Sequence, residues 1–202
     1  MTPNRSNEKV KTDTFLQKKQ LLLEAAALLI LKKGFFATSM NEIAAKLGIN
    51  KASLYHYCSS KDEIAIDIQR LNVEYVTNIF EEAEVNCENG MEKLRYFWLG
   101  YTKLMTTPIG AAGIQIAAMP HSKALEESAN LLFKEANISV RGYLIEGQAD
   151  GSIASVNAEW SDFVLFGVLH WIPRWYSSEG SLDPEQLGNQ LFDVILSGLL
   201  PR

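Results

Sequence analysis

Apolar residues recur at helical spacing along most of the chain. Between residues 15 and 33 they are three or four positions apart: Leu22, Ala25, Ala26, Leu29 and Ile30. This spacing gives a helix one continuous apolar face, and Gly34, which follows Lys32 and Lys33, is typical of a helix end. Ser39, followed three residues later by Glu42, has the pattern of a capping box and predicts that a second helix begins there.

The same spacing predicts helices in the rest of the chain. We expect a long helix from Asp62, then helices over 91–105, 122–146 and 157–176, and a last one opened by Asp183-Pro184. Residues 106–120 are rich in Gly and Pro, so we expect an irregular segment or a short helix only. No segment alternates as a β-strand does, and the predicted fold is all-α with about nine helices.

Residues 40–59 (MNEIAAKLGINKASLYHYCS) read as two short helices around a sharp turn. The positions that two steeply crossing helices must bury are all apolar or aromatic: Ile43, Leu47, Ile49, Leu54 and Tyr57. The small Ala44 suits a close crossing of the two helices, and Gly48 suits a turn that needs positive φ. This pattern favours a helix-turn-helix, although an ordinary helical hairpin could mimic it.

The exposed side of the second helix of this motif carries polar groups that suit DNA. The residues expected to contact bases or phosphates are Thr38, Ser39, Asn50, Lys51, Ser53, Tyr55, His56 and Lys61. His56 has an alternative interpretation as a capping or packing histidine.

Charge supports a nucleic-acid partner. Residues 1–61, here called the head, contain ten Lys and Arg against four Asp and Glu, whereas residues 62–202, the body, contain nine against twenty. A basic head (net +6) on an acidic body (net −11) indicates that the head meets a polyanion, unless the imbalance is chance. Residues 1–14 read as a flexible basic arm.

Composition and motif content argue against several other classes of protein: membrane proteins, exported proteins and enzymes. The apolar runs are too short for a membrane span, no export signal begins the chain, and two cysteines fit a reducing cytoplasm. No metal-ligand spacing or strand-linked glycine loop is present, so we expect no cofactor, no metal site and no enzyme activity. A nucleophile paired with a base stays open as an alternative.

The stretch AAALLILKKGFFATSMNEIAAKLGINKASLYHYCSSKDEI resembles the N-terminal domain of the TetR family, over about residues 16–76. The resemblance implies a DNA-binding domain over 15–61, a ligand-binding and dimerisation domain over 62–202, and a homodimer that is usually a repressor released by a small molecule. The family usually has Phe where this chain has Cys58, which reads either as a small core residue or as a redox switch.

The last two predicted helices are unusually apolar and contain small residues that permit close approach. The positions expected in a dimer interface are Phe163, Gly167, Leu187, Leu191, Val194, Ile195 and Gly198. By the family resemblance these helices form a four-helix bundle with their symmetry mates. The alternative is that they bury only against their own chain.

The segment HWIPRWYSSEGSLDPEQL resembles a TetR subgroup in which several members sense coenzyme A thioesters. A pocket for a partly apolar acid is expected from aromatic and cationic positions on two helices: Trp98, Tyr101, Met105, Arg141, His170, Trp171, Arg174 and Trp175. Pro173 is expected to kink its helix. The alternatives are that these aromatics are core, that the ligand is a hydrophobic drug or toxin, or that the body only dimerises or binds protein.

Overall fold

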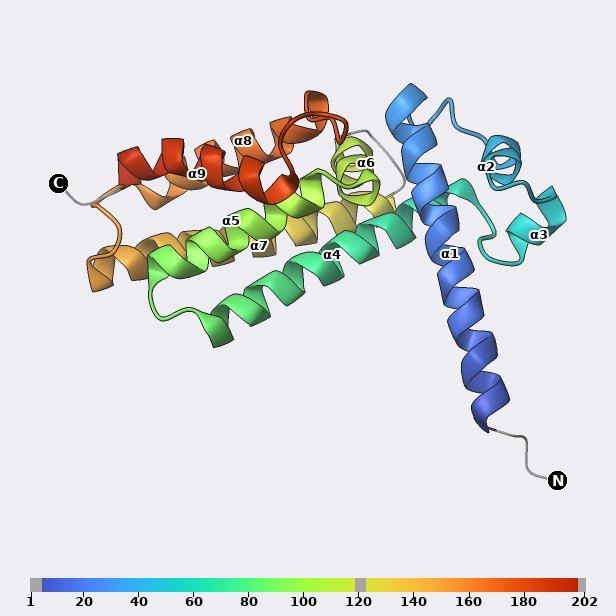
Figure 1. Cartoon of the computed structure of the whole chain (residues 1–202), viewed down its shortest axis with the longest axis horizontal. Helices are drawn as coiled ribbons and strands as arrows, with labels where there is room; N and C mark the ends of the chain where they lie inside the picture. Colours follow the sequence, from blue (N-terminus) through green and yellow to red (C-terminus); the bar gives the residue numbers. More distant parts are fainter. Residues whose placement is uncertain (1–4, 119–122, 200–202) are drawn as a thin grey trace.

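The computed structural model describes residues 5–118 and 123–199, and all regular structure in these ranges is helical (Figure 1). In chain order the elements are α1 (Arg5–Lys33), α2 (Met40–Lys46), α3 (Lys51–Tyr55), α4 (Lys61–Asn86), α5 (Gly90–Met105), α6 (Pro108–Ala117), α7 (Lys123–Asp150), α8 (Ala158–Trp171), the 3₁₀ turn η1 (Ile172–Arg174) and α9 (Pro184–Leu199). The predicted all-α fold with about nine helices is confirmed. None of the described helices has the length and apolar character that crossing a bilayer requires.

Two separate apolar cores divide the molecule. Helices α1–α3 gather at one end of a bundle made by α4, α5, α7, α8 and α9 (Figure 1). One core lies in this bundle, and the other lies among α1–α3, the first turns of α4 and one side of α6. The head's core is therefore completed by two segments from the body.

Helix α4 links the two cores. Its first turns place Ile64, Ala65 and Ile68 in the core of the head, and its later turns place Val76 and Ile79 in the core of the body. The domain boundary expected after Lys61 falls at the first residue of this helix. Because α4 runs without a break through both cores, the head and the body share this helix.

Several helix starts are fixed by side chains that the sequence marks. Ser39 accepts a hydrogen bond from the Glu42 N–H, and the Glu42 carboxylate accepts one from the Ser39 N–H, which completes the predicted capping box of α2. The Asp183 carboxylate accepts from the backbone N–H groups of Glu185 and Gln186 at the start of α9.

Helix α1 is longer than predicted. It begins at Arg5, so the part of the expected flexible arm that the structure describes is helical, while residues 1–4 lie outside the described residues. No Gly or Pro occurs between Arg5 and Lys33, and nothing local therefore ends the helix. The ring of Phe15 packs 5.0 Å from the ring of Tyr57, between centroids, which holds this part of α1 against the end of the motif.

For residues 106–120 the structure shows the second of the two expected alternatives, a short helix, whereas the kink expected at Pro173 is not found. Residues 106–120 contain a regular ten-residue helix, α6, with Thr107 as N-cap and Pro108 at the first position; residues 119 and 120 lie outside the described residues. Pro173 does not kink a long helix, because α8 ends at Trp171 and Pro173 sits in the following 3₁₀ turn. Proline lacks the N–H that a continuing α-helix needs, and the 3₁₀ turn removes that need.

Candidate functional site

The turn between α2 and α3 has the packing that the sequence predicts. Ile43, Ala44 and Leu54 are buried, and Gly48 has φ of +67°, a conformation that side-chain-bearing residues rarely adopt. Leu47, Ile49 and Tyr57 are partly buried around the same core. The two short helices are thus held at a fixed angle, which leaves the outer side of α3 free.

Cys58 is a buried residue of the head's core. Burial raises the pKa of its thiol to about 11, so the thiolate that redox chemistry needs is suppressed at neutral pH. Its Sγ, a Glu63 oxygen and an Asp67 oxygen are close enough to hold a metal ion. However, the Lys19 ammonium lies 2.8 Å from the Asp67 carboxylate and already supplies positive charge there. These observations favour the interpretation of Cys58 as a small core residue.

The exposed face of α3 presents polar side chains to solvent. Lys51, Ser53 and Tyr55 are exposed, and the Lys51 ammonium lies 5.6 Å from the centre of the Tyr55 ring. Asn50 is exposed as well, and its Oδ1 accepts a 2.8 Å hydrogen bond from the Ser53 N–H as the N-cap of α3. The side chains of Lys51, Ser53 and Tyr55 are therefore available for contact with DNA.

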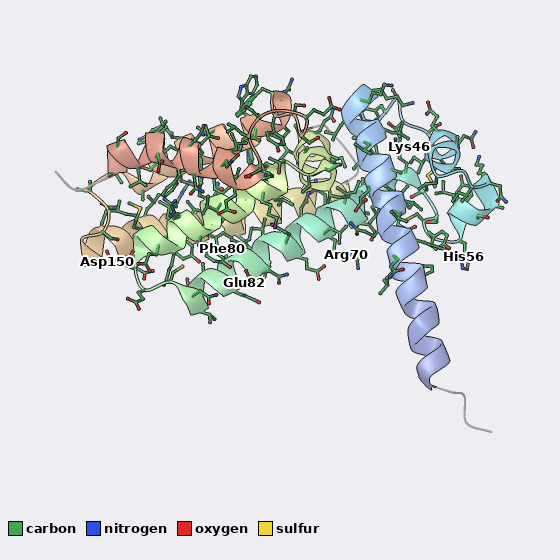
Figure 2. The ribbon with its side chains drawn as sticks, viewed as in Figure 1. Lys46, His56, Arg70, Phe80, Glu82 and Asp150 are labelled. Atoms are coloured by element: carbon green, nitrogen blue, oxygen red, sulfur yellow. The ribbon has the colours of Figure 1, made fainter. Side chains whose placement is uncertain are left out.

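His56 lies on the head at the end of the molecule away from the bundle (Figure 2). It is exposed, but its ring also meets the ring of Phe15 edge-on, with centroids 6.0 Å apart, and the ring of Tyr57 at 5.4 Å. The packing interpretation of this histidine is therefore consistent with its surroundings, and its exposed edge still faces solvent.

Two residues expected to contact phosphates have other partners. Thr38 is only 2% exposed, and its hydroxyl donates to the Gly34 carbonyl. The Lys61 ammonium donates to the backbone carbonyls of Phe35 (2.7 Å), Phe36 (3.2 Å) and Thr38 (2.8 Å). Because an ammonium has three N–H donors, Lys61 is fully used in fixing the turn before α2. Sequence reasoning missed this role because the residues involved are more than twenty positions apart.

The aromatic face of α5 is buried core, where Tyr101 and Met105 line a cavity of about 10 Å³. Trp98, Tyr101 and Met105 are all at most 3% exposed. The Trp98 Nε1–H donates to the Gly188 carbonyl of α9, so the indole is fully partnered. These three expected pocket residues therefore belong to the core that α4, α7, α8 and α9 form around α5.

An open cleft of about 570 Å³ lies between α1, α6 and the end of α8. We call it the α6 cleft; its lining residues are Leu31, Ala111, Ile114, Gln115, Ala118, His170, Trp171, Pro173 and Arg174. Three of the expected pocket residues, His170, Trp171 and Arg174, thus come together. The Arg174 guanidinium lies 5.6 Å from the centre of the Trp171 indole, which is exposed.

Sequence reasoning missed the α6 side of this cleft. The Thr107-Pro108 pair has the cap and first-position residues that open a helix, and this signal could have located α6. Gln115 contributes a buried Oε1 atom that has no hydrogen-bond partner. An unpaired buried acceptor costs free energy, so this oxygen is a polar atom that the described residues leave unsatisfied.

The remaining two expected pocket residues lie elsewhere. The Arg141 Nε donates a 2.8 Å hydrogen bond to the Asp162 carboxylate, whose side chain is fully buried. Burial raises the pKa of Asp162, while the Arg141 charge opposes that shift. Arg141 is therefore paired within its own chain, and Trp175 is half-exposed outside the cleft.

The outer face of α8 is apolar and uncovered. Its exposed large side chains repeat at helical spacing: Trp160, Phe163, Val164 and Trp171. Gly167 is exposed on the same stripe, and Val194 of α9 is 74% exposed. Leu187 lies instead in the core of its own chain, against which Leu191 and Ile195 are partly buried. The surroundings of Gly198 lie outside the described residues.

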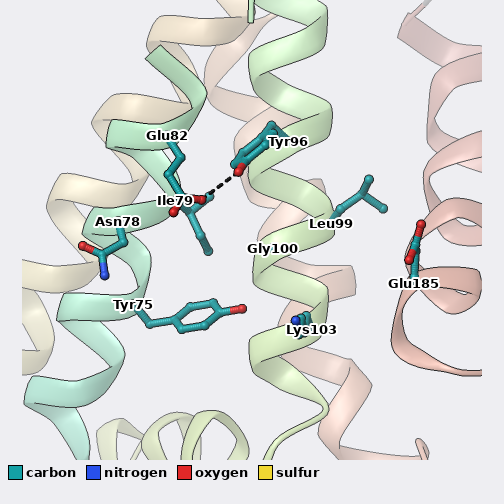
Figure 3. Close-up of a pocket in the computed structure, with 9 residues that line it drawn as sticks. All are labelled: Tyr75, Asn78, Ile79, Glu82, Tyr96, Leu99, Gly100, Lys103 and Glu185. Carbon is teal, nitrogen blue, oxygen red and sulfur yellow. Dashed lines mark hydrogen bonds between the residues drawn. The ribbon is translucent and has the colours of Figure 1, made fainter. Parts of the chain in front are cut away.

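A second groove, of about 450 Å³, lies between α4, α5 and the start of α9 (Figure 3). The Tyr96 hydroxyl donates a 2.7 Å hydrogen bond to Glu82 across it, and Lys103 and Glu185 stand at its edges. Gly100 permits the close approach of α5 to Ile79 on α4, because a Cβ there would lie 2.9 Å from the Ile79 side chain. None of the predicted ligand residues lines this groove.

Solved structures of other proteins share this fold. The ketosteroid transcriptional regulator KstR2 of Mycobacterium tuberculosis has a TM-score of 0.78 and 21% identity, covering 92% of this chain and 96% of that one. AibR in complex with isovaleryl coenzyme A and operator DNA has a TM-score of 0.74 and 23% identity, covering 87% of this chain and 96% of that one.

Sequence comparison gives the same relationship. The transcriptional repressor KstR2 of Rhodococcus jostii is 27% identical over 184 residues, which covers 88% of this chain and 89% of that protein. The family model for bacterial regulatory proteins of the tetR family matches residues 22–68, and the tetracyclin repressor-like C-terminal domain model matches residues 87–199. Together with the helix-turn-helix geometry, these matches show that the chain is a DNA-binding transcriptional regulator and belongs to the TetR family.

Proposed function

We propose that the protein is a homodimeric repressor, released from its operator when a small amphipathic molecule, such as an acyl-coenzyme A or a fatty or aromatic acid, occupies the α6 cleft. The observation that carries this proposal is the combination of an apolar floor with the Arg174 guanidinium and the Trp171 indole at one edge. A guanidinium suits a carboxylate or phosphate, and an indole face suits a flat group. The similarity to AibR, solved with isovaleryl coenzyme A and operator DNA, supports the same ligand class.

The DNA-reading surface is the outer side of α3. We assign base or phosphate contacts to Lys51, Ser53 and Tyr55, with His56 at the end of the helix. Ser39 and Asn50 cap the two short helices, so their role is to fix the reading surface. Such a regulator acts in the cytoplasm, where the operator is.

Dimerisation supplies the second reading helix. The exposed stripe of Trp160, Phe163 and Val164 on α8 is an apolar face of the kind that a second copy buries. Two copies related by a two-fold axis place two α3 helices on one face of the DNA, and recognition of a pseudo-palindrome needs them about one DNA turn (~34 Å) apart.

The experiment that tests the ligand has two readouts. A thermal-shift screen covers acyl-coenzyme A esters, free fatty and aromatic acids and cationic drugs, and every compound that stabilises the protein is then tested for release of an operator selected from random DNA. We expect an anionic, partly apolar compound to do both. Stabilisation without release would show that binding is not coupled to DNA, and a screen without any stabilising compound would favour a body that only dimerises.

Variants distinguish the two cavities. Arg174→Ala should weaken binding of the anionic compound at least tenfold, whereas Lys103→Ala, which removes an exposed cation from the groove of Figure 3, should leave it unchanged. The reverse result would move the ligand to that groove. For DNA, the logarithm of affinity should fall steeply and linearly with the logarithm of salt concentration, because phosphate contacts release counterions.

A further inference from the structure

Helix α6 has two faces with different neighbours. Ile109, Ala112 and Ile116, spaced by three and four residues, are buried in the core of the head. Ala111 and Ile114 lie on other sides of the helix and line the α6 cleft. One short helix from the body is therefore both part of the head's core and the floor of the proposed ligand site.

Two side chains of α4 fix α6 in register. The Gln69 Nε2–H donates a 3.0 Å hydrogen bond to the Gly113 carbonyl, and the Asn72 Nδ2–H donates a 3.3 Å bond to the Ile109 carbonyl. Gly113 permits this contact, because a Cβ there would lie 1.8 Å from Asn72 Nδ2. Since both amides are buried, α6 cannot slide along α4 without leaving polar groups unpaired.

The walls of the α6 cleft belong to different domains. Leu31, which is partly buried against the head's core, comes from α1, whereas Trp171 and Arg174 stand at the end of α8 and in η1. A molecule that fills the cleft therefore touches the head directly as well as the body.

We propose that a ligand in the α6 cleft acts as a wedge between α1 and the end of α8, and that Leu31 is the side chain through which it displaces the head. This inference rests on the proposed function for the identity of the ligand, but the wedge itself is a property of the cleft. The suitable ligand has an apolar part that reaches Leu31 and one anionic group at Arg174. A ligand shifts the head only as far as it fits the released position better than the DNA-bound position.

The first test needs no ligand. Ala118→Phe adds a large side chain at an exposed position that lines the cleft, and Ala149→Phe makes the same change at an exposed position on α7 outside it. We expect Ala118→Phe to weaken operator binding at least tenfold in a fluorescence-anisotropy titration, with the dimer intact by gel filtration. If the folded Ala118→Phe dimer binds the operator as tightly as Ala149→Phe does, the wedge is wrong.

The second test separates binding from release, with octanoyl-coenzyme A as the probe. Leu31→Ala removes part of the cleft lining and should weaken binding of octanoyl-coenzyme A, so each variant is compared at a concentration that saturates it. At saturation, the effect of octanoyl-coenzyme A on operator binding should fall from at least tenfold in the wild type to less than threefold in Leu31→Ala. The matched control is Leu28→Ala, three residues earlier on α1, exposed and outside the cleft. Normal release by Leu31→Ala would overturn the role of Leu31.

The two tests also separate this inference from the proposed function. If the wild-type protein does not bind octanoyl-coenzyme A, the ligand class proposed above loses support. In that case the operator affinity of Ala118→Phe still decides whether filling the α6 cleft displaces the head.

Discussion

The phenolic oxygen of Tyr101 lies 2.9 Å from Nε2 of His170, and this pair connects the core of the body to the α6 cleft. Tyr101 is buried, whereas His170 also lines the cleft. Burial lowers the pKa of His170 to about 4 and raises that of Tyr101. Both groups are therefore uncharged at neutral pH, and the rings of Phe133 and Phe166 enclose the imidazole.

Protonation of His170 should destabilise the fold at acid pH. The pKa of His170 is lowered in the folded state, so the unfolded chain binds the proton more tightly. The contribution of the neutral imidazole to the free energy of unfolding is therefore fully present above about pH 6.5. Below that value the free energy of unfolding should fall by at most about 1.4 kcal/mol per pH unit until about pH 4. Urea unfolding at a series of pH values measures this slope. His170→Gln should lose part of it, and the control His56→Gln, an exposed histidine, should keep the wild-type profile; an unchanged slope in His170→Gln would contradict the assignment.

Lys61 is predicted to matter for stability and not for DNA affinity. Lys61→Met removes the donor for three backbone carbonyls and should cost about 1–3 kcal/mol in the free energy of unfolding. Lys51→Met, on the exposed face of α3, should leave stability unchanged and weaken operator binding. Denaturant unfolding and operator titration of both variants check the contrast. Equal stability of the two variants would show that the Lys61 hydrogen bonds contribute little.

Tyr55 is predicted to contact the operator. Its side chain is 44% exposed on α3, and Tyr55→Ala should weaken specific binding by about 1–3 kcal/mol, or roughly five- to 150-fold, without affecting the dimer. Tyr55→Phe separates the hydroxyl from the ring, because it keeps the packing under Lys51. An operator affinity of Tyr55→Ala equal to wild type, at the same salt concentration, would remove Tyr55 from the reading surface.

The exposed face of α8 is predicted to form the dimer. Phe163 is 52% exposed, and Phe163→Glu should place a charge in an apolar interface and produce monomers that fold but no longer bind the operator tightly. The matched control is Ile138→Glu on α7, where the original side chain is 60% exposed and outside α8 and α9. Sedimentation at micromolar concentration measures the oligomeric state, and a dimeric Phe163→Glu protein would place the interface elsewhere.

The head could be predicted closely because its signals are local. The capping box of Ser39 and Glu42 and the positive φ of Gly48 depend on residues a few positions apart. The length of α1 could not be read in the same way. A polar, charged segment without Gly or Pro fits either a helix or a flexible arm, and the Phe15–Tyr57 contact that favours the helix joins residues more than forty positions apart.

The candidate ligand site was predicted only in part. Three of its expected residues, His170, Trp171 and Arg174, meet in one cleft because they are neighbours along the chain at the end of α8. Trp98 and Arg141 are of residue types that often line ligand pockets. Whether they do so here depends on which helices pack against them, and the sequence does not show this. Phe192 of α9 covers Trp98, and Asp162 of α8 pairs with Arg141.

The sequence by itself determined the all-α fold, the helix-turn-helix and the relationship to the TetR family, because helical periodicity, caps and the steric pattern of residues 40–59 act over short distances. The tertiary structure alone decided that Lys61 is a structural residue and that the α5 aromatics are core. It also decided that α6 belongs to the head's core and at the same time forms the floor of a cleft between the head and the body. The physical reason is the same in each case. Hydrogen-bond partners and open volume are set by contacts between segments far apart in the chain, and those contacts exist only once the helices have packed.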